Sequence, residues 1–160
     1  MSVLNRIEAL STVQRKLLTL DDIARFDVAD FIRELVTDLV GGVGRIQLTL
    51  DLAPLLVPAV KATPLSLIVN ELVGDAVNRG LSDGGGAIHV DVKRMQGHFV
   101  IRVEDTSTPV QPDAETAEFG RLLLEASARQ LAASIERKVE GSRSVVEVTL
   151  LVDEHQESGN

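Results

Sequence analysis

Two carboxylates four residues apart, Glu71 and Asp75, are the side chains of this sequence most suited to chemistry. They belong to a predicted helix at residues 65–78, and a spacing of four places them on the same face of that helix. The helix is apolar over much of its circumference, so two like charges on it cost stability. The pair could handle a cation or activate a water molecule. The alternative is that both carboxylates lie at an exposed end of a helix whose other face is buried.

A third carboxylate, Asp105, follows a segment in which apolar and polar residues alternate, and it opens a polar segment at residues 106–118. A polar loop of about a dozen residues is usually functional or mobile. Asp105 could accept hydrogen bonds from a ligand in a cleft, or it could simply form a turn. The glycine cluster at residues 41–44 follows a predicted helix and lacks Lys-Ser/Thr, so it indicates a helix end and not a phosphate loop.

Hydrophobic periodicity predicts the elements that must position these carboxylates. Apolar stripes predict helices at residues 2–20, 27–40 (capped by Asp27) and 65–78, and a further helix at 120–133. Alternation predicts a strand near residues 46–50, an edge strand or loop at 55–60, and hairpins at 88–103 and 135–151. The expected fold is therefore α+β: a mostly antiparallel sheet with helices on one face, plus an additional N-terminal helix.

Composition excludes several classes of function. The chain has 160 residues, enough for one domain, and 16 basic against 24 acidic residues give a net charge of −8, which repels nucleic-acid phosphates. Four Phe with no Trp or Tyr leave little for bases to stack on, and the absence of Cys excludes thiolate chemistry. No apolar stretch approaches the ~20 residues of a membrane span, and no secretory signal begins the chain. We expect a cytoplasmic protein that binds neither nucleic acid nor membrane.

Residues 62–76 (ATPLSLIVNELVGDA) resemble the N-box helix of the GHKL ATPases, most closely that of HWE and related bacterial histidine kinases. Residues 100–105 are similar to the strand that leads to the adenine-binding aspartate of that family. Residues 119–131 are similar to its second glycine box and the helix that follows. Residues 6–17 resemble the second helix of the kinase dimerisation hairpin. The resemblance implies a Bergerat-type sandwich at residues 27–152, a remnant dimerisation helix at 1–26 and a disordered tail at 153–160.

The same resemblance implies roles for four residues. Glu71 corresponds to the acidic residue that orients water or metal, and Asp75 stands where the family has an asparagine that holds Mg²⁺. Asp105 corresponds to the adenine-reading aspartate, and Gly120 to the first glycine of the second box. Two departures threaten the nucleotide site: residues 106–109 (TSTP) replace a glycine-bearing motif, and Leu122 replaces a second glycine. Side chains at these positions are expected to crowd a nucleotide.

The resulting hypothesis is a degenerate histidine-kinase-like module, a pseudokinase of two-component signalling that needs no cofactor and acts by binding proteins. We expect a homodimer formed through Leu4, Ile7, Leu10 and Leu17, and a response-regulator receiver as a possible partner. The alternative is an ATP- and Mg²⁺-binding catalytic domain that phosphorylates a histidine on another chain. A third hypothesis is a histidine phosphotransferase. None of the histidines, which are His89, His98 and His155, lies in a segment suited to a phospho-acceptor.

Overall fold

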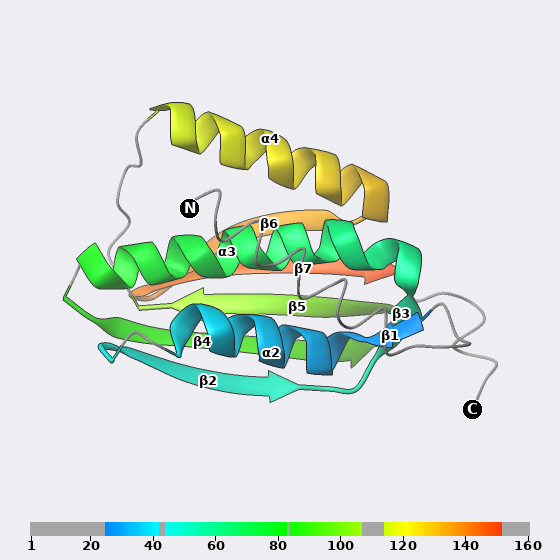
Figure 1. The fold of residues 1–160 in the computed structure, drawn as a ribbon, viewed down its shortest axis with the longest axis horizontal. Coiled ribbons are helices and arrows are strands. Elements are labelled where there is room, and N and C mark those ends of the chain that lie inside the picture. The colour runs from blue at the N-terminus through cyan, green and yellow to red at the C-terminus, as the bar shows by residue number, and fades with distance from the viewer. Residues whose placement is uncertain (1–24, 42–43, 83, 107–113, 152–160) are drawn as a thin grey trace.

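The computed structural model describes residues 25–41, 44–82, 84–106 and 114–151. Its main sheet has five strands in the order β2-β4-β5-β7-β6, in which β2 runs parallel to β4 and all other neighbours are antiparallel. Three helices accompany the sheet: α2 and α3 lie against one of its faces, and α4 packs along α3 (Figure 1). The predicted α+β architecture is confirmed.

The bounds of the main elements follow the hydrophobic pattern of the sequence. The strands are β2 (Ile46–Leu52), β4 (Gly86–Met95), β5 (His98–Asp105), β6 (Ser134–Glu140) and β7 (Arg143–Leu151), and the helices are α2 (Val28–Val40), α3 (Ala62–Ser82) and α4 (Ala114–Leu131). Both predicted hairpins are present, β4–β5 and β6–β7, and their turns contain Gly97 and Gly141 with positive φ. A side chain would strain the backbone at these two positions.

A second, two-stranded sheet lies at one end of the domain. It pairs β1 (Arg25–Asp27) with β3 (Leu56–Pro58), and a 3₁₀ turn (Ala59–Lys61) then leads into α3. The segment predicted as an edge strand or loop is therefore a short strand whose partner is β1. Such a partner is invisible in local periodicity because it lies about thirty residues away along the chain.

The hydrophobic core lies between the main sheet and α2 and α3. Alternate residues of β4 and β5 face these helices, while their neighbours face the other side of the sheet. Helix α3 is buried around most of its circumference because it contacts the sheet, α2 and α4. Its buried apolar residues include Leu65, Ile68, Val69, Leu72, Val73 and Ala76.

Helix α4 begins earlier than the sequence predicts, at Ala114 instead of residue 120. Its first turns contain good helix formers, and Arg121 pairs with Glu118 at 2.7 Å and with Glu125 at 2.8 Å, one turn away in each direction. Gly120 therefore lies inside a helix and not at its start. Helix α3 also extends beyond the predicted range at both ends.

Several expectations concern residues outside the described ranges. The predicted helix at residues 2–20, the dimer contacts of Leu4, Ile7, Leu10 and Leu17, and the tail at 153–160 all lie there, as do residues 107–109. Within the described ranges, no helix is both long enough and apolar enough to cross a bilayer.

Asp27 begins α2 as predicted, and it also ties this helix to the small sheet. Its Oδ1 accepts hydrogen bonds from the backbone N–H of Ala29 at 2.9 Å and of Leu55 at 3.3 Å. One carboxylate oxygen thus caps the helix and fixes the chain that precedes β3.

We expect Asp27→Ala to lower the free energy of unfolding by about 2 kcal/mol, because both backbone donors lose their acceptor. The matched control is Asp30→Ala, which removes an exposed ion pair to Arg33 at 3.3 Å and one negative charge from the first turn of α2, and should cost less than about 1 kcal/mol. Urea unfolding of both variants measures the difference, and equal losses would show that the cap does not join α2 to the small sheet.

Candidate functional site

Three charged residues of α3 share one face of the helix: Glu71, Asp75 and Arg79, spaced four apart. We call them the α3 strip. At 1.5 Å of rise per residue, Glu71 and Arg79 lie about 12 Å apart along the helix axis. Glu71 is 2% exposed and Asp75 is partly buried. The alternative that both carboxylates lie at an exposed helix end is therefore wrong.

The Glu71 end of the strip is in contact with α4. A Cβ atom added to Gly120 would stand 3.1 Å from Glu71 Oε2, so the backbone of α4 passes directly beside this carboxylate. Two of the four predicted site residues are thus brought together. They meet because α4 starts early and places Gly120 on its face toward α3, where Leu124 and Ser127 are also buried.

The other end of the strip meets the end of β5. Arg79 Nη2 donates a hydrogen bond to Asp105 Oδ2 in an ion pair in which the Asp105 side chain is 2% exposed and that of Arg79 19%. Thr106, the next residue, is held to Ala87 by two hydrogen bonds of 3.1 and 3.2 Å. Asp105 is therefore a buried partner of α3, and the alternative of a simple turn residue is wrong.

Arg79 is the site residue that sequence analysis missed. A signal was present: it is the one basic residue between Ala62 and Ser82, and it continues the spacing of four set by Glu71 and Asp75. Leu122, expected to crowd a phosphate site, is 50% exposed on α4, and its effect on such a site stays a prediction. The residue of α4 that faces Glu71 is Gly120.

The described residues do not fit ATP and Mg²⁺ as they are arranged. Asp105 accepts a hydrogen bond from a guanidinium at the place where the family resemblance puts a purine amino group. A Cβ on Gly120 would stand 3.1 Å from Glu71 Oε2, so α4 narrows the space that a phosphate or water would require in front of this carboxylate. Asp75 keeps an oxygen that could bind Mg²⁺, but it adds a negative charge beside Glu71. Within the described ranges, no three His, Asp or Glu side chains gather as a metal site.

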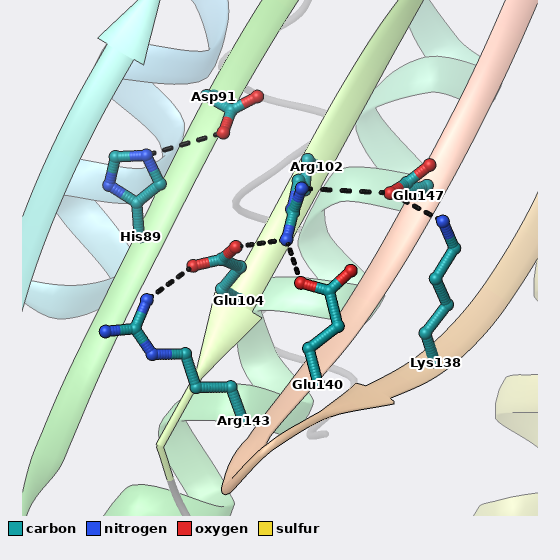
Figure 2. Close-up of polar contacts among 8 residues, drawn as sticks. All are labelled: His89, Asp91, Arg102, Glu104, Lys138, Glu140, Arg143 and Glu147. Carbon is teal, nitrogen blue, oxygen red and sulfur yellow. Dashed lines mark hydrogen bonds and ion pairs between the residues drawn. The ribbon is translucent and has the colours of Figure 1, made fainter.

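A hollow lies on the open face of the sheet, the side away from the helices. It is a groove of about 400 Å³ over β4 and β5, lined by Thr49, His89, Asp91, Arg102, Glu104 and Arg143 among others. Figure 2 shows the charged side chains that stand on this face. Asp105 is among the residues that line the groove, whereas Glu71, Asp75 and Gly120 are not.

The open face is a network of paired charges centred on Arg102. Its guanidinium contacts Glu104 at 2.5 Å, Glu140 at 2.6 Å and Glu147 at 3.9 Å (Figure 2). Lys138 pairs with Glu147 at 3.1 Å and Arg143 with Glu104 at 3.4 Å. Carboxylates surround Arg102, and they raise its pKa further against the opposing effect of its desolvation. Except for the pair of Arg102 with Glu104 on the same strand, these contacts join different strands and indicate that the charges help to stabilise the sheet.

Asp91 is the buried acid of the open face, with 5% of its surface exposed. Its Oδ2 lies 3.4 Å from Nε2 of His89. Burial raises the pKa of the Asp91 carboxyl above its ordinary value of 3.8, and the positive charges of Lys93, His89 and Arg102 offset this only in part. Ionised Asp91 therefore costs stability.

We expect Gly120→Val to destabilise the fold by about 2 kcal/mol, because the added Cβ would stand 3.1 Å from Glu71 Oε2, closer than an ordinary contact, and two methyl groups need room beyond it. The control is Ala126→Val at an exposed position of the same helix, which should cost less than about 1 kcal/mol through helix propensity alone. Thermal unfolding compares the two. Equal effects would mean that α4 does not press on Glu71 in solution.

A pH dependence follows from Asp91. Because its pKa is higher in the folded than in the unfolded chain, its contribution lowers stability as the pH rises through 3.8 and above. Asp91→Asn should therefore raise Tm at pH 7, and the gain should vanish as the pH falls below 3.8. Asp38→Asn, an exposed change on α2, should leave Tm nearly unchanged at pH 7. A lower Tm for Asp91→Asn at pH 7 would contradict the assignment.

Comparisons with known proteins place the fold. No family model matches the sequence, and no curated protein matches it. Among solved structures, the histidine kinase domain of the blue-light activated histidine kinase EL346 from Erythrobacter litoralis superposes with a TM-score of 0.81 at 18% identity, over 92% of this chain and 73% of that one. A longer structure of the same kinase gives 0.77 at 17% identity, over 94% of this chain and 54% of that one.

The catalytic domain of histidine kinase ThkA, in a nucleotide-free form, gives a TM-score of 0.66 at 17% identity over 81% of this chain and 97% of that one. These identities are low, so the likeness concerns the fold. The described chain has the α+β fold of histidine kinase catalytic domains, as the N-box resemblance implied.

Proposed function

We propose that this chain is a degenerate histidine-kinase-like module that acts in two-component signalling by binding proteins, with nucleotide binding weakened or lost. The observation that carries the proposal is the closeness of α4 to Glu71: even a single added carbon, a Cβ on Gly120, would stand 3.1 Å from Glu71 Oε2. A residue that orients water or metal needs space in front of its carboxylate, and α4 narrows that space.

The charge of the α3 strip supports the same proposal. A triphosphate is bound by backbone N–H groups, basic side chains or a metal ion. The strip offers two carboxylates, and its single cation, Arg79, is already paired with Asp105. Bringing phosphates to this face of α3 would add negative charge beside Glu71 and Asp75.

The fold itself supports the main alternative, a catalytic domain that binds ATP and Mg²⁺ and phosphorylates a histidine on another chain. Retention of Glu71, Asp105 and Gly120 also favours it. The altered surroundings of these three residues favour the protein-binding module. A histidine phosphotransferase is less well supported: His89 lies on strand β4 beside Asp91, and His98 lies next to a turn, where its ring nitrogen is 3.1 Å from the Gln96 carbonyl.

The partners proposed are a second copy of the chain and a receiver domain of a response regulator. The dimer hypothesis depends on the spacing of Leu4, Ile7, Leu10 and Leu17, a stripe that would be a liability if exposed on a monomer. These residues lie outside the described ranges, so the hypothesis stays a prediction from sequence. A receiver is proposed by analogy with the fold.

Isothermal titration of the chain with ATP and Mg²⁺ tests the proposal. We expect no binding heat at millimolar nucleotide, because both ends of the α3 strip are engaged. Asp75→Asn is the informative companion variant, because it restores the amide expected from the resemblance and leaves Gly120 and Arg79 in place. It should therefore also give no binding heat. Micromolar binding by the unmodified chain would overturn the proposal, and binding by Asp75→Asn alone would show that charge and not closure prevents it.

A further inference from the structure

The ion pair between Arg79 and Asp105 joins two elements that are remote in sequence. Arg79 lies in the last turn of α3 and Asp105 is the last residue of β5. The carboxylate is almost completely buried, and the guanidinium is about four-fifths buried. We propose that the Arg79 side chain occupies the position in front of Asp105 where the resemblance places a purine, and that it thereby prevents a nucleotide base from binding there. The proposal rests on the proposed function, and it names the residue responsible.

The chemistry of the guanidinium suits this role. It is planar, and its edge carries N–H groups that donate hydrogen bonds to a carboxylate. The exocyclic amino group of adenine donates in the same way. Arg79 Nη2 donates to Oδ2 of Asp105 at hydrogen-bond distance, so the guanidinium takes the space directly in front of that oxygen. With Asp105 only 2% exposed, no second planar donor can approach from the same side.

Arg79 is a different cause from the one expected from sequence, which was crowding of the nucleotide by residues 106–109 and by Leu122. Of these, Thr106 bonds to Ala87 and Leu122 is half-exposed. Arg79 contacts the Asp105 carboxylate directly, so we expect its removal to open the purine position even though the other changes stay.

The experiment is a titration of Arg79→Ala with adenosine, followed by calorimetry and by the shift in Tm. Adenosine is the probe because it carries no phosphate and so does not test the Glu71 end. We expect its affinity to rise at least about tenfold over the unmodified chain, with a Tm that increases with adenosine concentration. Inosine, which lacks the amino donor, should not bind. The control Arg33→Ala removes an exposed arginine from its pair with Asp30 and should change nothing.

Arg79→Ala leaves a buried carboxylate without its cation, which can unfold the chain. The second variant, Arg79→Ala with Asp105→Asn, removes both charges and keeps a carbonyl acceptor, so it should fold and still gain adenosine binding. The inference is wrong if a folded variant of either kind fails to bind adenosine at millimolar concentration. Adenosine binding by the unmodified chain as strong as by the variants would also overturn it. ATP binding by the unmodified chain at micromolar concentration would instead refute the proposed function.

Discussion

The buried ion pair between Arg79 and Asp105 is the interaction on which the described site depends. It fixes the end of α3 to the end of β5, so the face of α3 that carries Glu71 and Asp75 is held in one rotation about the helix axis. A buried pair of this kind contributes little net stability compared with apolar residues, yet the loss of one partner is strongly destabilising. Its main effect is therefore on geometry: it sets the direction in which the α3 strip faces.

At the opposite end of the strip, the constraint is steric. Helix α4 starts at Ala114 and runs antiparallel to the direction of α3, as Figure 1 shows, and Gly120 lets its backbone approach the Glu71 carboxylate. The two ends are constrained by different means, one by charge pairing and one by close packing. Under the proposed function, these two constraints are the reason why a fold shared with histidine kinase catalytic domains keeps three of the expected residues and has weak or no nucleotide binding.

The sequence predicted those parts of the fold that depend on local patterns. The Asp27 cap, the β4–β5 hairpin with its turn at Gly97, and the stripe of α2 follow from spacing and turn chemistry alone. The start of α4 was predicted wrongly because residues 106–118 are polar and indicated a loop, whereas helix formers and the ion pairs of Arg121 extend the helix back to Ala114. The pairing of β1 with β3 was missed because it is a tertiary contact.

The roles of the four candidate site residues stay predictions from sequence. Glu71, Asp75, Asp105 and Gly120 lie along or beside α3, and the partners of Asp105 and Glu71 could not be inferred from sequence. Arg79 sits two turns beyond Glu71, and only the placement of β5 beside α3 brings it to Asp105. Whether a carboxylate faces a ligand or an arginine of its own chain depends on such packing, which periodicity does not encode.

The most direct test is nuclear magnetic resonance of the arginine side-chain N–H groups in the unmodified chain, with and without ATP and Mg²⁺. If Arg79 is held by Asp105 in solution, its guanidinium signals should be separate and protected from solvent exchange, unlike those of exposed Arg33, and they should not move at millimolar nucleotide. Signals of Arg79 that are averaged like those of Arg33, or that shift saturably as nucleotide is added, would show that the purine position is open.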